Sequence, residues 1–262
     1  MTEHASDVRI LHRDADLLVL YKPAGLATTS PNGRDCLTEV AAQLDPRAPR
    51  LHASSRLDAE VTGVVTFART SRAIEALLAA RRAGRYERYY LGLATGPIEP
   101  AIGELDWPID RDPRDPRKRV AVPRVETSAP ARVIRGPKSK RKDPPQEART
   151  RYRVVSSQPM VALLLLSPLT GRTHQLRVHV ARAGAPLLGD RHYGGPTQRT
   201  LANGRVVRAG RVMLHCARVR LPRIDRSGEP LTLDAPIPDD FHAVWRALGG
   251  EHSQLEQALL EA

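Results

Sequence analysis

The chain has 262 residues, which is long enough to bury a sizeable hydrophobic core. Hydrophobic residues make up 41% of the sequence and aromatic residues only 4%, so Leu, Val, Ile and Ala must form most of that core. Lys and Arg number 41 against 29 Asp and Glu, giving a formal net charge of +12. This excess predicts a polyanionic partner, because neutralised phosphates release counterions. A composition that simply favours arginine is the alternative.

The sequence argues against a membrane-spanning or disulfide-linked protein. Its longest apolar run, residues 161–166, is far shorter than the roughly 20 residues that span a bilayer. Cys36 and Cys216 are too few for a disulfide framework and lack metal-site spacing, so we expect two buried thiols in a reducing compartment. Residues 1–7 contain no apolar segment before a cleavage site, and we therefore expect a cytoplasmic protein.

Apolar runs and turn signals predict a mixture of strands and helices. In chain order, we expect a strand over 17–21, a strand over 64–68, a helix from 71 to 84, a strand over 86–94, a hairpin of 151–155 and 160–166, a helix over 172–182, strands over 213–221 and 231–233, and a helix over 239–248. The elements do not alternate regularly, which favours an α+β fold with a mixed, mainly antiparallel central sheet flanked by helices and loops. Beyond Gly250 we expect a short or frayed helix.

Residues 112–148 differ from the rest of the chain, because they are dense in Pro, Arg and Lys and too poor in apolar residues for a core. They include Lys138, Lys140, Arg141 and Lys142. We predict a mobile surface loop whose basic side chains follow a phosphate backbone, although a solvated loop without a partner fits equally well. We expect the whole chain, 1–262, to form one domain that carries this loop.

Asp58 is the first candidate for chemistry. It lies between Arg56 and the pair Thr62-Gly63, directly before the strand predicted over 64–68. A carboxylate on a loop that leads into a strand can be held rigidly while it faces a cleft. An aspartate that accepts backbone hydrogen bonds in a turn has the same spacing, and spacing alone favours this ordinary explanation.

A second polar segment covers residues 169–179, where Gly171 and Thr173 mark a helix start. Arg172, His174 and Arg177 could present donors to phosphates or carboxylates there. His174 and His179 are five residues apart, which is not the spacing of a helical zinc pair, so we expect no metal. The glycine-rich residues 184–195 lack the pattern of a nucleotide phosphate loop and favour a tightly turned structural connection.

Taken together, these segments resemble the RluA-type family of pseudouridine synthases, and the resemblance spans nearly the whole chain in order. It rests on residues 22–25, 56–63, 88–96, 171–179, 189–194 and 214–216. Three positions depart from the family pattern. Ser55 replaces a histidine, Val61 stands in the usual Thr-Ser-Gly, and Arg88 replaces a lysine.

The resemblance implies an isomerase that needs no metal or cofactor and converts uridines of structured rRNA or tRNA to pseudouridine. Asp58 would be the nucleophile, Arg177 would pair with it, and Tyr90 would stack on the uracil and assist removal of the C5 proton. Arg56 would fill the gap that the flipped uridine leaves in the stack. The remaining RNA contacts would come from Arg88, Arg172, His174 and the basic residues 138–142.

Many proteins of this family carry a small N-terminal RNA-binding domain, but only 16 residues precede the strand predicted over 17–21, so we expect the catalytic domain to recognise RNA without one. We also expect a monomer. Two other functions stay open. The altered flank of Asp58 is compatible with a weak or inactive relative that only binds RNA. A metal-dependent hydrolase would use His174, His179, His192 and His215, although their spacing argues against it.

Overall fold

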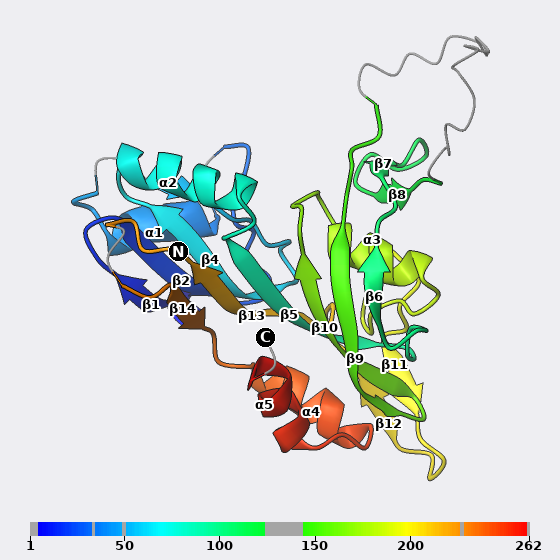
Figure 1. Cartoon of the computed structure of the whole chain (residues 1–262). Coiled ribbons are helices and arrows are strands. Elements are labelled where there is room, and N and C mark those ends of the chain that lie inside the picture. The colour runs from blue at the N-terminus through cyan, green and yellow to red at the C-terminus, as the bar shows by residue number, and fades with distance from the viewer. Residues whose placement is uncertain (1–4, 33–34, 49–50, 124–143, 226–227, 261–262) are drawn as a thin grey trace, which may run out of the picture.

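The computed structural model describes residues 5–32, 35–48, 51–123, 144–225 and 228–260 (Figure 1). A ten-stranded sheet with the order β1-β2-β4-β13-β5-β10-β9-β6 runs through it, while β3 pairs with β4 and β14 with β13. The sheet strands are β1 (Arg9–Arg13), β2 (Leu17–Lys22), β3 (His52–Ala53), β4 (Thr62–Ala68), β5 (Glu87–Ala94), β6 (Ile102–Leu105), β9 (Thr150–Gln158), β10 (Val161–Pro168), β13 (Leu214–Leu221) and β14 (Leu231–Asp234).

Shorter elements surround this sheet. Two small hairpins are formed by β7 (Ile109–Arg111) with β8 (Arg119–Ala121), and by β11 (Gln198–Thr200) with β12 (Val206–Arg208). The helices are η1 (Ala5–Asp7), α1 (Leu37–Leu44), α2 (Ser71–Arg82), α3 (Gln175–Arg182), α4 (Asp239–Ala247) and α5 (His252–Leu260). None of the helices in the described ranges is long and apolar enough to cross a membrane.

Helices cover both faces of the sheet at its centre, around β5, β10 and β13. Every residue of β2 and of β4 is also buried, in agreement with the apolar runs of these two strands. Alternate residues of β5 enter different cores: Tyr90 packs with α1, α2 and α3, whereas Leu91 packs with α4 and α5. In Figure 1, α1 and α2 accordingly lie on one side of the sheet and α4 and α5 on the other.

One parallel pairing at the centre of the sheet brings distant parts of the chain together. The described strand pairs are antiparallel except β4–β13, in which His215 pairs with Thr62 and Cys216 with Gly63. Gly63 has a φ of +122°, and a Cβ atom there would lie 2.1 Å from the Cys216 carbonyl oxygen. Only glycine therefore fits, and the close contact fixes the loop before β4 against β13 and its neighbour β5.

The structure confirms the predicted fold, a mixed and mainly antiparallel sheet flanked by helices. Both cysteines are buried thiols, as predicted. The tail after Gly250 is the helix α5. The predicted helix over 172–182 was wrong at its start, because α3 begins at Gln175. The preceding residue, His174, has a left-handed φ of 57° and interrupts the helix there.

The loop predicted over 112–148 was wrong in part, because Arg119–Ala121 form a strand. This strand pairs with Ile109–Arg111, and the hairpin packs against α3 through Ala121 and Val178. The strand was not predicted because the segment contains too few apolar residues to show a strand pattern. In the structure, α3 supplies the apolar surface against which the strand packs. Lys138, Lys140, Arg141 and Lys142 lie outside the described residues, so their predicted RNA contact stays a prediction.

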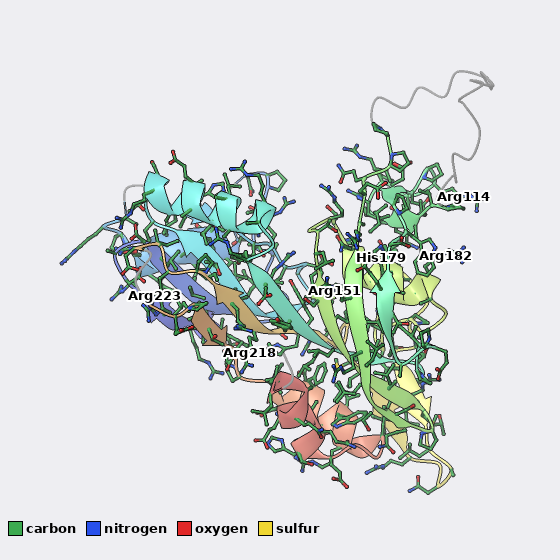
Figure 2. All side chains as sticks on the ribbon, viewed as in Figure 1. Arg114, Arg151, His179, Arg182, Arg218 and Arg223 are labelled. Atoms are coloured by element: carbon green, nitrogen blue, oxygen red, sulfur yellow. The ribbon has the colours of Figure 1, made fainter. Side chains whose placement is uncertain are left out.

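Arginine side chains are spread over both ends of the molecule (Figure 2). Arg114 and Arg182 lie around the β7–β8 hairpin and α3, Arg223 lies at the opposite end of the molecule, and Arg218 lies between them on β13, close to α5. Arginines are therefore not confined to one end of the described structure, so their positions alone do not identify a functional site.

Candidate active site

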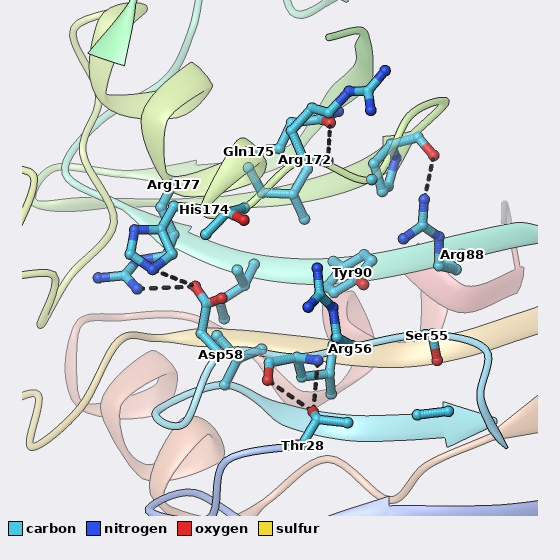
Figure 3. Close-up of a pocket in the computed structure, with 18 of the residues that line it drawn as sticks. Thr28, Ser55, Arg56, Asp58, Arg88, Tyr90, Arg172, His174, Gln175 and Arg177 are labelled. Carbon is cyan, nitrogen blue, oxygen red and sulfur yellow. Dashed lines mark hydrogen bonds and ion pairs between the residues drawn. The ribbon is translucent and has the colours of Figure 1, made fainter. Parts of the chain in front are cut away.

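A pocket of about 380 Å³ lies where the β3–β4 loop, β5 and the start of α3 meet (Figure 3). This volume is in the range of small-molecule sites. The sequence-predicted site residues within the described ranges all line it: Arg56, Asp58, Arg88, Tyr90, Arg172, His174 and Arg177. Residues from three distant segments of the chain thus converge on one cavity.

The loop that carries Asp58 is held by hydrogen bonds on both sides of the residue. Thr28 Oγ1 accepts a hydrogen bond from the Leu57 N–H and donates one to the Leu57 carbonyl, both at 2.9 Å. Lys22 Nζ, at 3.0 Å, and the Gly25 N–H, at 2.9 Å, both donate to the Ala59 carbonyl. Because its neighbours are fixed, Asp58 can keep its side chain 27% exposed in the pocket without a flexible backbone.

Arg177 joins two carboxylates beneath the pocket. Its Nη1 donates to Asp58 Oδ2 at 2.9 Å, while Nε and Nη2 donate to the two oxygens of Asp190 at 2.8 and 2.7 Å. Burial acts to lower the pKa of Arg177, but the hydrogen bonds and charges of Asp190 and Asp58 outweigh it and raise the pKa. The guanidinium is therefore a permanent cation that Asp190 orients toward Asp58.

Both contacts to Asp58 reach the same oxygen. Arg177 Nη1 and, at 3.8 Å, His174 Nε2 approach Oδ2, as the two dashed lines to Asp58 in Figure 3 show. Of the residues that the structure describes, none donates a hydrogen bond to Oδ1. The Arg177 guanidinium thus holds Oδ2 with His174 nearby, and Oδ1 accepts no hydrogen bond from the described residues.

Tyr90 lies in the pocket wall on β5, opposite Asp58 (Figure 3). Its side chain is buried, and it pairs across the sheet with Cys216 of β13. Burial, followed by the contact with Cys216, raises the pKa of Tyr90 well above its usual range. The phenol therefore stays neutral and offers the pocket an uncharged aromatic ring.

The three pocket arginines that were predicted to contact RNA differ in how firmly they are held. Arg88 donates Nη2 to the carbonyl of Thr170 at 2.8 Å and to that of Pro168, which ties β5 to the turn before α3. Arg172 donates Nε to the Glu147 carbonyl and is otherwise exposed. Arg56 is exposed, and nothing in the described part of the chain pairs with it. Of the three, Arg56 is the most available for a ligand.

Sequence reasoning missed three residues that build this site. Asp190 was treated as part of a structural connection, yet it is fully buried and holds Arg177. Gln175 organises the turn before α3, since its Oε1 accepts from the Arg172 N–H and the Thr170 hydroxyl. Thr28 lies 30 residues before Asp58 in sequence. Only Asp190 had a local signal in the sequence, since it lies between Gly189 and the glycines at 194–195. Its partner Arg177 could not be inferred from spacing.

The two departures beside Asp58 fit the fold. Ser55 is buried, and its Oγ accepts a hydrogen bond from the Thr66 N–H at 3.2 Å. Val61 is also buried and belongs to the main core. Both uncharged residues therefore support the loop that carries Asp58, Ser55 through its hydrogen bond to β4 and Val61 through packing in the core.

The four histidines of the hydrolase alternative do not meet. His179 contacts the Thr150 hydroxyl and the Trp107 carbonyl, and His215 contacts the Thr62 hydroxyl in the core. His174 and His192 lie near each other, with ring centroids 6.2 Å apart. Within the described residues, no group of three or more His, Cys, Asp or Glu side chains could hold a metal ion.

The chain is similar to known proteins of one family. Residues 16–182 match the family model described as RNA pseudouridylate synthase. The chain is 34% identical to "Ribosomal large subunit pseudouridine synthase D" of Nitrosomonas europaea, over 97% of this chain and 70% of that protein. It is 30% identical to "Dual-specificity RNA pseudouridine synthase RluA" of Escherichia coli, over 87% of this chain and 92% of that protein.

A solved structure shows the same similarity. "Human RNA Pseudouridylate Synthase Domain Containing 4" superposes with a TM-score of 0.67 and 27% identity, covering 91% of this chain and 92% of that one. The match to the family model includes the Asp58 loop, Tyr90 and Arg177. The chain therefore belongs to the RNA pseudouridine synthase family that its motifs resemble.

Proposed function

We propose that the protein isomerises uridines in structured rRNA or tRNA and that Asp58 is its nucleophile. The observation that carries this proposal is the arrangement of Asp58, Arg177 and Asp190. A carboxylate on a rigid loop, partly exposed in a pocket and held at one oxygen by a buried guanidinium, is suited to attack an electrophilic carbon.

In this reaction the carboxylate attacks either C1′ of the ribose or the uracil ring, and the N1–C1′ bond breaks. The base turns so that C5 faces C1′, a C5–C1′ bond forms, and the bond to the carboxylate breaks again. C5 loses its proton and N1 gains one from solvent, so the product is an isomer of the substrate. Asp58 Oδ1 would attack, because Arg177 Nη1 occupies Oδ2. Tyr90 would stack on the uracil and hold it while it turns.

Access to Asp58 requires that the uridine leave its helix, because a stacked base cannot enter a pocket of this size. Arg56 is exposed beside the carboxylate and free of described partners, so it would fill the gap in the stack. Arg172 is exposed on the opposite wall and would contact the phosphate backbone. The names of the relatives, which include ribosomal large subunit and dual-specificity RNA enzymes, support RNA of this kind as the substrate.

The test is the release of tritium from C5-labelled uridine in total RNA that lacks pseudouridine. Wild-type protein should release tritium with or without a chelator, and Asp58→Asn should release none while it still binds RNA. Asp234→Asn is the matched control, because Asp234 also pairs with an arginine but is exposed and lines no part of the pocket. If wild-type protein releases no tritium but binds RNA, the protein acts as a binding protein only. Full activity of Asp58→Asn would exclude it as the nucleophile.

A further inference from the structure

His174 and Tyr193 form a chain of contacts that ends at Asp58. The Tyr193 hydroxyl lies 2.7 Å from His174 Nδ1, and His174 Nε2 lies 3.8 Å from Asp58 Oδ2. The same hydroxyl accepts a hydrogen bond from the Arg119 backbone N–H of β8 at 2.9 Å. The chain of contacts therefore begins at the backbone of the β7–β8 hairpin and reaches the carboxylate through two side chains.

The partners of the Tyr193 hydroxyl decide which nitrogen of His174 carries the proton. Arg119 supplies a backbone N–H, so the hydroxyl must accept there, and its own hydrogen is left for His174 Nδ1. An Nδ1 that accepts a hydrogen bond leaves the proton of the neutral ring on Nε2. The protonated nitrogen then faces Asp58.

We propose that Tyr193 and His174 are positioning residues, in which the Tyr193 hydroxyl fixes His174 so that its Nε2–H acts as a neutral second donor to Asp58 Oδ2. The inference rests on the proposed role of Asp58 as the nucleophile. At 3.8 Å the contact is longer than a hydrogen bond, and such contacts in substrate-free sites commonly shorten when the substrate binds. His174 was predicted to contact RNA, and this geometry turns it toward the carboxylate instead.

The backbone supports a special position for His174. Its φ of 57° is left-handed, a conformation that costs energy for a residue other than glycine and is found mainly where the surroundings enforce it. The left-handed turn lets the side chain at the N-terminus of α3 contact Tyr193 on one side and Asp58 on the other.

The surroundings of His174 favour its neutral form. Burial is the largest effect and lowers the pKa of His174, and neighbouring cations act in the same direction, while only Asp58 opposes them. The titratable and charged groups that face the ring are Asp58, Arg177, Arg119, His192 and Tyr193. Burial also raises the pKa of Tyr193 to about 12, so its hydroxyl keeps the proton that it donates.

Tyr193→Phe tests the hydroxyl alone. The ring of Tyr193 lies 5.2 Å from the Arg177 guanidinium carbon and packs near α3, and phenylalanine keeps both contacts. Tyr152→Phe is the matched control, because Tyr152 is also buried and donates to the Pro100 carbonyl at 2.8 Å, away from the pocket.

Nitrogen NMR of protein labelled in its histidines gives a readout that does not depend on activity, with His174→Asn used to assign the ring. The wild type and Tyr152→Phe should carry the His174 proton on Nε2. Tyr193→Phe should show a mixture of the two forms and a higher His174 pKa, because the hydrogen bond to Nδ1 that favours the neutral ring is lost. A proton on Nδ1 in the wild type, or identical spectra for wild type and Tyr193→Phe, would overturn the proposal.

Single-turnover tritium release tests whether the Tyr193–His174 contact affects the reaction. Tyr193→Phe should slow the step by roughly threefold to tenfold, the fold-change expected for one lost hydrogen bond, with unchanged RNA affinity. The acidic limb of its pH–rate profile should move to higher pH together with the His174 pKa. If the rate and pH profile of Tyr193→Phe equal those of the wild type, the positioning role of Tyr193 and His174 is refuted, even if Asp58→Asn is inactive. If Asp58→Asn is active, the nucleophile assignment fails, while the NMR result still reports on the Tyr193–His174 contact.

Discussion

Arg177 makes more charged contacts than any other side chain around the pocket. Its contacts therefore affect both the stability of the fold and the position of Asp58. Its side chain is only 4% exposed and that of Asp190 is fully buried, so each depends on the other for compensation of its charge. Nε and Nη2 of Arg177 donate to Asp190, and the remaining nitrogen, Nη1, donates to Asp58. A substitution at Arg177 therefore acts at once on the fold and on Asp58, the proposed nucleophile, and the two effects must be separated.

We predict that Arg177→Met lowers the free energy of unfolding by about 3–5 kcal/mol, because Asp190 keeps a buried charge without a partner. The double variant Arg177→Met/Asp190→Leu should recover most of this loss, since it removes the unpaired carboxylate as well. Both variants should lose tritium release by far more than they lose RNA affinity. Denaturant unfolding, an RNA-binding titration and the release assay measure the three quantities.

Arg218→Met is the control for a broken ion pair. Arg218 pairs with Asp234, whose side chain is 49% exposed, so its loss should cost less than about 1 kcal/mol. Equal stability of Arg177→Met and wild type would contradict the importance assigned to Asp190. A double variant with restored activity would show that Asp58 does not need the guanidinium.

Sequence could reveal part of this site but not all of it. Asp58 and Arg177 were found through the motifs around them, and the contact expected between them is present. Asp190 and Tyr193 belong to the same quoted motifs, but their roles depend on which side chains they meet across the fold. Spacing reports neighbours along one helix or strand, whereas the Asp58–Arg177 contact joins residues 119 positions apart.

At the scale of elements, the site depends on the parallel contact between β4 and β13. Gly63 permits this contact, because its missing Cβ atom is where the Cys216 carbonyl lies. The loop that carries Asp58 leads directly into β4, and Cys216 pairs on its other side with Tyr90. This close backbone approach thus sets the loop that carries Asp58 relative to the Tyr90 ring.

We predict that Gly63→Ala destabilises the protein by more than about 3 kcal/mol, because the side chain adds a backbone clash to an unfavourable φ. Gly96→Ala is the matched control, since a Cβ atom there meets nothing within 4 Å and its φ is not left-handed. It should change stability by less than about 1 kcal/mol. Thermal and denaturant unfolding of both variants check the difference. If Gly63→Ala is as stable as Gly96→Ala, β4 and β13 are not held as closely as described.

Sequence predicted the largely buried strands β2, β4, β5, β10 and β13 well. β2 and β10 contain long apolar runs, which are visible without knowledge of their partners. The more exposed strands β9 and β14 were predicted as well. β1 and β6 were missed because they are the two edges of the sheet and are largely exposed, so their sequences lack a clear apolar pattern. The β7–β8 hairpin was missed because α3 provides much of its core.

At the scale of the whole molecule, the net charge of +12 must be divided between residues that bind RNA and residues that merely keep the surface charged. Exposed arginines occur at both ends of the structure, and only some line the pocket. Total charge affects nonspecific attraction from every direction, whereas counterion release counts only the phosphates that are actually contacted. Salt dependence can therefore distinguish the two groups.

We predict that replacing Lys138, Lys140, Arg141 and Lys142 by Gln weakens RNA binding and reduces the steepness of its salt dependence. If each residue contacts one phosphate, the slope of log affinity against log salt should become shallower by roughly 3. The control replaces Arg205, Arg208, Arg223 and Arg246, which are exposed and line no part of the Asp58 pocket. Both variants lose the same four charges, so a difference between them reports position. Equal slopes for the two variants would mean that overall charge drives binding, and a basic-segment variant that matches wild type would refute its predicted RNA contact.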